Sequence, residues 1–159
     1  MKRSIPAALF ATLGALSAAA MAQSPPPAYG ESVTLDQARK CMAAGEAEMK
    51  KNGWQMVITV VDTGGMAVAV ARVDGAQYAS VEISRAKAWA AAGFRRPTKV
   101  FFEGVGKGNT YLMSLPGVVA SEGGIPIMMG GKIVGAVGVS GGTGQQDGVA
   151  AQACVDALK

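Results

Sequence analysis

The sequence predicts a single α/β (α+β) domain in which a central antiparallel β-sheet is flanked by helices. Three observations favour this fold class. Helical and strand patterns follow one another as helix, two strands, helix, a short helix, two strands and helix. A short glycine-containing turn separates the strands of each pair, which is typical of antiparallel hairpins. The chain has 159 residues, of which 50% are hydrophobic, and this suits one domain with one core.

Residues 1–22 are expected to be a secretory signal peptide. Lys2 and Arg3 supply a positive start, residues 7–20 form an apolar run, and Ala20–Ala22 is a small-x-small cleavage site. A membrane anchor is the weaker interpretation, because the run is short for a bilayer and ends in alanines. Cleavage would leave no membrane span and place the protein in the periplasm or outside the cell.

The remaining chain divides into a proline-rich spacer at residues 23–33, expected to be extended and mobile, and a domain at residues 34–159. Loss of Lys2 and Arg3 takes the formal net charge from +4 to +2. The mature chain is therefore nearly neutral, and no nucleic-acid partner is expected.

The first helix and the first hairpin follow the spacer. Thr34 is a good N-cap, Gln37 completes a capping box, and Asn52–Gly53 ends the helix. Strands are predicted at 54–61 and 66–73, on either side of a turn at 62–65.

The second half repeats this order of elements. Residues 80–94 are rich in helix formers. The stretch 98–120 is broken by four glycines and a proline, and it predicts loop and short helix. Strands at 125–129 and 133–140 form a second hairpin around Gly130–Lys132, and residues 143–159 form a closing helix.

The chain contains no histidine, which restricts its chemistry. A Ser-His-Asp triad, a Cys-His dyad and a His-ligated zinc site are all excluded. The two cysteines, Cys41 and Cys154, lie on the first and last helical patterns. In an oxidising compartment they are either a disulfide that ties the ends of the domain together or two small buried apolar side chains.

Residues 135–147 run from the last strand into a glycine-rich turn and then into the last helix. Such a turn presents backbone N–H groups and a positive helix end to an anion. The alternative is a tight connection whose glycines only satisfy positive φ angles. The ligand-binding candidates here are Ser140, Gly141, Gly142 and Thr143.

Two further regions carry polar candidates. Arg72 and Asp74 leave the second strand and predict either a small polar ligand site or a surface ion pair. Gly123 and Gly124 precede a buried strand, and Glu122 is the carboxylate beside them. Glu122 and Lys87 are weak catalytic candidates, because neither has a partner acid or a positioned nucleophile in the sequence pattern.

Three motifs together resemble a known family. They are VVDTGGMAVAVARVDGA at 60–76, the helix at 84–88 leading to 94–98, and GGIPIMMGGKIVGAVGVSGGTGQQDGVAAQA at 123–153. In this order, over about 35–158, they resemble the GlcG/HbpS haem-binding or "haem-degrading" domain family. The same domain resembles the C-terminal part of some cobalamin adenosyltransferases.

The resemblance implies a small α/β domain that assembles as dimers or larger homo-oligomers, and haem as a cofactor of some members. The positions that match the family's motifs are Asp62, Gly64, Gly65, Arg72, Asp74, Gly75, Lys87, Gly123, Gly124, Pro126, Ser140, Gly141, Gly142, Gln146 and Asp147.

The missing histidine is a departure from some haem-binding relatives. Axial ligation of haem would have to come from Met, Tyr, Lys, Thr, Cys or water. Met66, Met113, Met128 and Met129 are candidates, although methionine in an apolar strand usually fills the core.

Taken together, these patterns predict an exported module that binds or senses a small molecule or anion. Haem without histidine ligation is one candidate ligand, and the expected site lies between the glycine-rich turn and the Arg72–Asp74 turn. The alternatives are a histidine-free enzyme, such as an isomerase, a lyase or an accessory metabolic factor, and a purely structural oligomer. The enzyme would use Glu122, Lys87, Arg72 or Asp74 at a subunit boundary.

Overall fold

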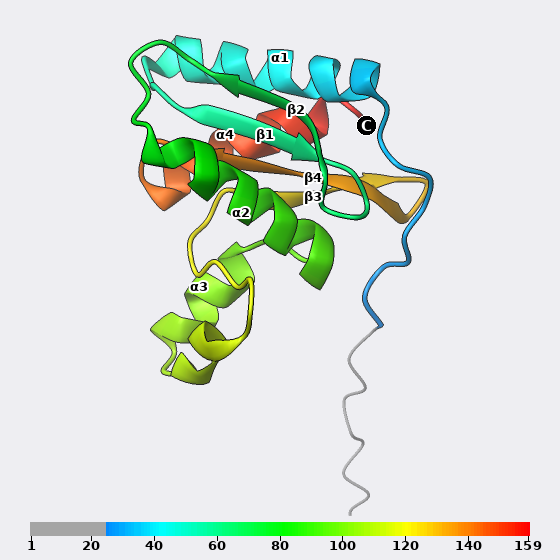
Figure 1. The fold of residues 1–159 in the computed structure, drawn as a ribbon, viewed down its shortest axis with the longest axis vertical. Helices are drawn as coiled ribbons and strands as arrows, with labels where there is room; N and C mark the ends of the chain where they lie inside the picture. The colour runs from blue at the N-terminus through cyan, green and yellow to red at the C-terminus, as the bar shows by residue number, and fades with distance from the viewer. Residues whose placement is uncertain (1–24) are drawn as a thin grey trace, which may run out of the picture.

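The computed structural model describes residues 25–159, so the predicted signal peptide lies outside the described residues. The described residues form four α-helices, one 3₁₀ helix and one sheet, arranged as Figure 1 shows. The elements are α1 (Leu35–Asn52), β1 (Val57–Val61), β2 (Ala67–Arg72), α2 (Ala79–Phe94), α3 (Lys99–Gly106), the 3₁₀ helix η1 (Thr110–Ser114), β3 (Gly124–Met129), β4 (Lys132–Ser140) and α4 (Gly144–Asp156).

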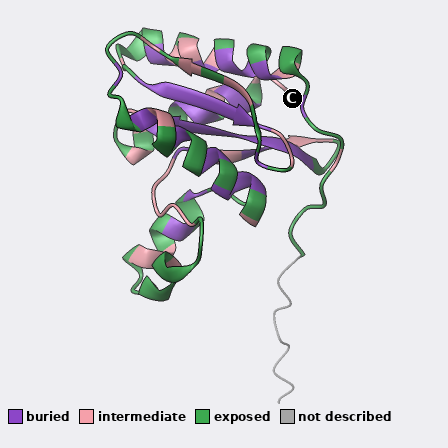
Figure 2. Cartoon of the chain, viewed as in Figure 1, coloured by how far each residue is buried: buried purple, intermediate pink, exposed green. Residues whose placement is uncertain are grey.

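The four strands form one antiparallel sheet in the order β2-β1-β4-β3, which confirms the predicted fold class. The central strands β1 and β4 are buried almost throughout, as Figure 2 shows. Val57 pairs with Arg72 on one side and with Ser140 on the other. This register places the C-terminal ends of β2 and β4 at the same end of the sheet, beside the start of β1.

Helices cover both faces of the sheet (Figure 1). Helices α1 and α4 pack together on one face, and α2 crosses the other face over β1, β4 and β3. The α1–α4 face holds the larger core, with Met49, Met56, Ile58 and Val137 among its buried members. Because larger side chains fill this side, it supplies most of the apolar burial that stabilises the domain.

The α2 face is built from small residues. Ala88, Ala91 and Ala92 on α2 pack against Val61 and Ala136 of the sheet. A Cβ at Gly138 would collide with the carbonyl oxygen of Ser84, so glycine is required there for this close approach. The alanine-rich composition of this helix therefore sets its distance from the sheet.

The two cysteines form a disulfide between α1 and α4. Cys41 and Cys154 are both fully buried, and their Cα atoms are 4.1 Å apart. Of the two interpretations left open by the sequence, the disulfide is therefore confirmed. It joins the first and last helices across the larger core.

Residues 98–120 form a short segment that projects from the sheet, as Figure 2 shows by its mostly exposed residues. It contains α3 and η1, in agreement with the prediction of loop and short helix. Thr98 anchors its start, because the Gly124 N–H donates to Thr98 Oγ1 at 3.0 Å and the Thr98 N–H donates to the Gly124 carbonyl at 2.9 Å.

Residues 25–33 of the spacer that was expected to be mobile are extended, and residues 29–33 are hydrogen-bonded to the domain. Tyr29 forms a parallel bridge with Ile133, and the Gly30 N–H donates to the Ile133 carbonyl at 2.8 Å. The Tyr29 hydroxyl donates to the Ala92 carbonyl at 2.8 Å. These long-range hydrogen bonds, which local sequence patterns do not reveal, hold the segment against β4 and the end of α2.

Candidate functional site

A buried ion pair lies between α2 and α4. Lys87 Nζ donates to Asp147 Oδ2 at 2.7 Å and to the Val139 carbonyl at 3.1 Å. Lys87 is 1% exposed and Asp147 is 3% exposed. The weak catalytic candidate Lys87 thus lies in the interior, with its ammonium group bound to protein oxygens.

Asp147 connects this ion pair to the glycine-rich turn. Its Oδ1 accepts a hydrogen bond from the Gly142 N–H at 2.9 Å. Burial raises the pKa of Asp147 above the ordinary value, and the hydrogen bond from Lys87 partly opposes that rise. Through its two oxygens, one carboxylate therefore positions both the α2 lysine and the turn.

N–H groups of the glycine-rich turn form hydrogen bonds within the protein. Besides the Gly142 bond to Asp147, the Thr143 N–H donates to Gln146 Oε1 at 2.9 Å and the Gln146 N–H donates to Thr143 Oγ1 at 3.3 Å. This is a capping box at the start of α4. Gly141 has φ 144°, and a Cβ there would lie 2.6 Å from the Gln55 carbonyl oxygen. These contacts favour a tight connection over an open anion cradle.

The Arg72–Asp74 turn lies beside the glycine-rich turn. Gly75 and Gln77 share a hollow of about 300 Å³ with Gly141, Gly142 and Gln146. Arg72 itself donates from Nη1 to the Ala76 carbonyl at 3.2 Å and lies over the Tyr78 ring at 5.2 Å. Those contacts occupy the guanidinium group, in place of the surface ion pair with Asp74 that the sequence suggested.

Ser140 ends β4 in a buried polar cluster. Its Oγ donates to Ser80 Oγ at 3.2 Å, and Ser80 Oγ also accepts from Gln77 Nε2 at 2.9 Å. Ser140 is 4% exposed. Its hydroxyl therefore joins β4 to the start of α2.

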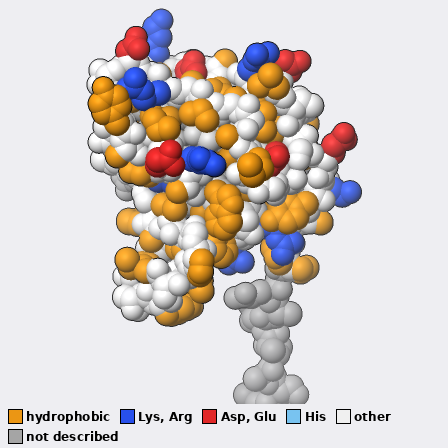
Figure 3. All heavy atoms as spheres, in the orientation of Figure 1, with side chains coloured by type: hydrophobic (Ala, Val, Ile, Leu, Met, Phe, Trp, Pro, Cys, Tyr) orange, Lys and Arg blue, Asp and Glu red, His pale blue; other side chains and the backbone are white. Residues whose placement is uncertain are grey.

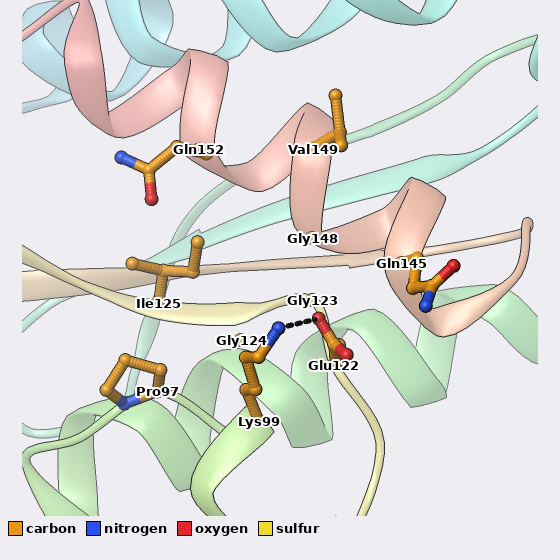
Figure 4. Close-up of a pocket in the computed structure, with 10 residues that line it drawn as sticks. All are labelled: Pro97, Lys99, Glu122, Gly123, Gly124, Ile125, Gln145, Gly148, Val149 and Gln152. Atoms are coloured by element: carbon orange, nitrogen blue, oxygen red, sulfur yellow. Dashed lines mark hydrogen bonds and ion pairs between the residues drawn. The ribbon is translucent and has the colours of Figure 1, made fainter. Parts of the chain in front are cut away.

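Glu122, Gly123 and Gly124 line a different hollow, which we call the β3–α4 pocket. Its volume is about 520 Å³, and Figure 4 shows the residues around it. They come from the start of α3 and the residue two positions before it, from the end of the loop before β3, from β3 and from one side of α4, namely Pro97, Lys99, Glu122, Gly123, Gly124, Ile125, Gln145, Gly148, Val149 and Gln152.

The predicted site residues are thus divided between two hollows. The backbone at Gly123 packs against the ion pair, where an added Cβ would lie 2.8 Å from Asp147 Cβ and 3.1 Å from Lys87 Nζ. Glu122 lines the β3–α4 pocket, Lys87 is buried, and Arg72 and Asp74 leave β2 beside the other hollow. The four residues considered for a histidine-free enzyme do not converge on one hollow.

A third hollow, of about 510 Å³, lies against the outer side of α2, and we call it the tryptophan pocket. It is lined by the β1–β2 turn, α2 and the loop after η1, namely Gly65, Met66, Glu82, Arg85, Ala86, Trp89, Gly117, Val118 and Val119. From the sequence, Met66 was considered as a haem ligand and Trp89 was missed. An isolated tryptophan in an alanine-rich helix is the signal that could have drawn attention to it.

The Trp89 ring is held between two glycines. A Cβ at Gly65 would lie 2.5 Å from Trp89 Cδ1, and a Cβ at Gly117 would collide with the opposite end of the ring at Cζ3. Phe94 meets the ring edge-on, with the centroids 6.4 Å apart. The indole is 43% exposed, so it is a fixed aromatic wall that still faces outward.

The β1–β2 turn presents Met66 to this pocket. Asp62 Oδ1 accepts hydrogen bonds from the Gly64 and Met66 N–H groups, each at 2.9 Å, which fixes the turn. Met66 is 63% exposed. On the face seen in Figure 3, hydrophobic side chains gather over α2 and the segment beneath it, and an acidic and a basic side chain lie next to each other among them.

Within residues 25–159, no helix is both long enough and apolar enough to cross a membrane.

The chain is similar to known proteins over most of its length. The family model described as "Haem degrading protein HbpS-like" matches residues 33–156. The Escherichia coli K12 protein GlcG is 42% identical over 108 residues, which cover 68% of this chain and 81% of GlcG.

Two solved structures share the fold. The Klebsiella pneumoniae protein ORFY has a TM-score of 0.75 and 30% identity, and the match covers 86% of this chain and 97% of ORFY. A double mutant of Streptomyces reticuli HbpS has a TM-score of 0.74 and 28% identity, with 97% and 99% covered. The motifs, the fold and the extent of these matches agree, and the chain belongs to the HbpS-like family.

Proposed function

We propose that this protein is an exported module that binds a flat, largely apolar small molecule with an acidic group, and that haem is that ligand. The observation that carries the proposal is the tryptophan pocket, where a fixed indole, an exposed thioether and a guanidinium group line one hollow. Its volume of about 510 Å³ lies in the range of small-molecule sites. The glycine-rich turn is a poorer candidate for the ligand site, because the N–H groups of Gly142, Thr143 and Gln146 already form hydrogen bonds within the protein.

The donor set of the tryptophan pocket fits haem. The chain has no histidine, and both cysteines are in the disulfide. The Met66 thioether, which lines the pocket, would therefore be the soft donor that holds the iron, and methionine is an established ligand of haem iron. Arg85 would pair with a propionate, and Trp89 and Val118 would pack on the porphyrin. The bound group would supply iron redox chemistry at this surface.

Export and self-association are further parts of the proposal. The buried disulfide supports an oxidising compartment, in line with the predicted signal peptide. The exposed hydrophobic residues Val70, Tyr78 and Ile83 lie on β2, before α2 and on α2, and support a homo-oligomer that covers this side of the molecule. The description of the family as haem degrading supports the choice of ligand.

A haem titration followed by the Soret band tests the proposal. We expect the purified protein to give a saturable shift at micromolar haem. Met66→Ala should weaken binding at least tenfold, whereas Met113→Ala should leave it unchanged. Met113 is a matched control because it is 67% exposed, close to the 63% of Met66, and does not line the pocket. No spectral change, or equal loss in both variants, would disprove the proposal.

A further inference from the structure

We infer that the β3–α4 pocket is a second ligand site, which takes a small primary amine with an apolar body. It shares no lining residue with the tryptophan pocket, so the inference is independent of haem binding.

The pocket combines an apolar floor with a few polar groups. Figure 4 shows Ile125 and Pro97 near Gln152 at one end, and Glu122 near Gln145 at the other. Its volume of about 520 Å³ is large enough for a small organic molecule. A ligand with an apolar body and one polar group would match this division.

The backbone of the pocket offers little to a ligand. The Gly123 carbonyl accepts from the Val139 N–H at 2.9 Å, and the Gly124 carbonyl accepts from the Thr98 N–H at 2.9 Å. The Gly124 N–H donates to Thr98. Recognition therefore falls to the side chains of Glu122, Lys99 and the two glutamines.

The charges favour a cation. Lys99 Nζ lies 3.3 Å from Glu122 Oε2 and 4.0 Å from Glu103 Oε1, so one ammonium group serves two carboxylates. The Glu122 side chain is only 12% exposed, whereas that of Lys99 is 55% exposed. An incoming ammonium group could replace Lys99 at Glu122, because Lys99 retains Glu103 as a partner.

An anionic ligand is disfavoured in the same place. The amino end of α4 attracts negative charge, and the acidic side chain of Glu122 already lies beside the first two turns of this helix. A Cβ at Gly148, in the second turn of α4, would lie 3.4 Å from Glu122 Oε2. The ligand group that complements this arrangement is therefore an ammonium group, with the glutamine amides as further acceptors.

Three probes of similar shape and different charge test the inference. Benzylamine, benzyl alcohol and benzoate are titrated into the ¹⁵N-labelled protein, and amide shifts are followed by NMR. We expect benzylamine to move the signals of residues 122–125 and 145–152 and to bind at least tenfold more tightly than the other two. Haem is absent, so failure of this experiment leaves the proposed function untouched.

Variants identify the recognising group. Glu122→Gln should weaken benzylamine binding about tenfold, and Lys99→Ala should strengthen it because the carboxylate is released. Asp36→Asn, at an exposed carboxylate of α1 that lines neither pocket, is the control and should change nothing. If Glu122→Gln does not fold, Glu103→Gln provides the second test, because Lys99 then stays on Glu122 and binding weakens. Equal or stronger binding of benzoate, shifts elsewhere, or no shifts at all would overturn the inference.

Discussion

Lys87 and Asp147 form an ion pair of 2.7 Å in the interior, although 60 positions separate them in the sequence. The lysine comes from the middle of α2 and the aspartate from the first turn of α4. Lys87 also binds the Val139 carbonyl of β4, and Asp147 also binds the Gly142 N–H. Four segments, α2, β4, the glycine-rich turn and α4, therefore depend on two side chains for their mutual placement.

Replacement of Lys87 by methionine should destabilise the protein strongly. It leaves the buried Asp147 without its cation, and loss of one partner of a buried pair costs about 3–5 kcal/mol. The free energy of unfolding, from urea denaturation, measures the effect. The double variant Lys87→Met with Asp147→Leu should recover part of the loss, and Lys159→Met, at an exposed pair, should cause no measurable change. A single variant as stable as the wild type would contradict this role.

The pKa values of the two aspartates of α4 should be shifted in opposite directions from the ordinary value of aspartate. Burial raises the pKa of Asp147, whereas hydrogen bonds from Lys159 and Gln152 lower the pKa of Asp156. Because the native pKa of Asp147 is raised, its contribution to stability is full below the ordinary value and is lost as pH rises through the native value. A pH titration of the carboxyl ¹³C signals should place the Asp147 midpoint above that of Asp156; the reverse order would contradict the assignment.

Removal of the disulfide should lower stability without changing the fold. Cys41 and Cys154 are 113 residues apart, and in the chain-entropy model a loop of this size contributes about 5 kcal/mol. The double variant Cys41→Ala with Cys154→Ala should therefore unfold at lower urea concentration. A reducing agent should lower the stability of the wild type and leave the double variant unaffected. Equal stability of the two oxidised proteins would argue against this stabilisation.

Gly65→Ala should disturb the tryptophan pocket. Gly65 has φ 80°, and its new Cβ would displace Trp89. Gly53→Ala is a matched control, because Gly53 has φ 68° with nothing within 4 Å of the added atom. Both variants should lose about 1–2 kcal/mol from the left-handed backbone. Only Gly65→Ala should also shift Trp89 fluorescence and weaken haem binding; equal effects of both variants would show that the indole is not held by this contact.

Local patterns in the sequence were sufficient for most of the fold. The capping box of Thr34 and Gln37 is present, with hydrogen bonds of 2.9 and 3.2 Å. The predicted start of the first strand was wrong by three residues, since β1 begins at Val57. The Trp54 N–H donates to the Met49 carbonyl, which extends the end of α1 into this segment. The C-terminal helix likewise ends at Asp156, short of the predicted Lys159.

The candidate sites were less predictable, because they depend on contacts between distant segments. The sequence indicated Lys87, in a helix, and Glu122, in a glycine-rich segment, as charged candidates. The structure gives them different roles, because only Lys87 is buried. Lys87 forms a buried ion pair with Asp147, whereas Glu122 lines the β3–α4 pocket, where it pairs with Lys99. Nothing in the local pattern around Trp89 indicates that Gly65 and Gly117 enclose its ring.

The cross-link between α1 and α4 also changes what a protease could do to this protein. Residues 42–153 lie inside one covalent ring, and the exposed segment of α3 and η1 is part of it. A cut in that segment would open the ring but release no fragment, because the disulfide still joins the two pieces. A nicked molecule would run as two bands on a gel only after reduction, and without a reductant it would keep both halves of its sheet together.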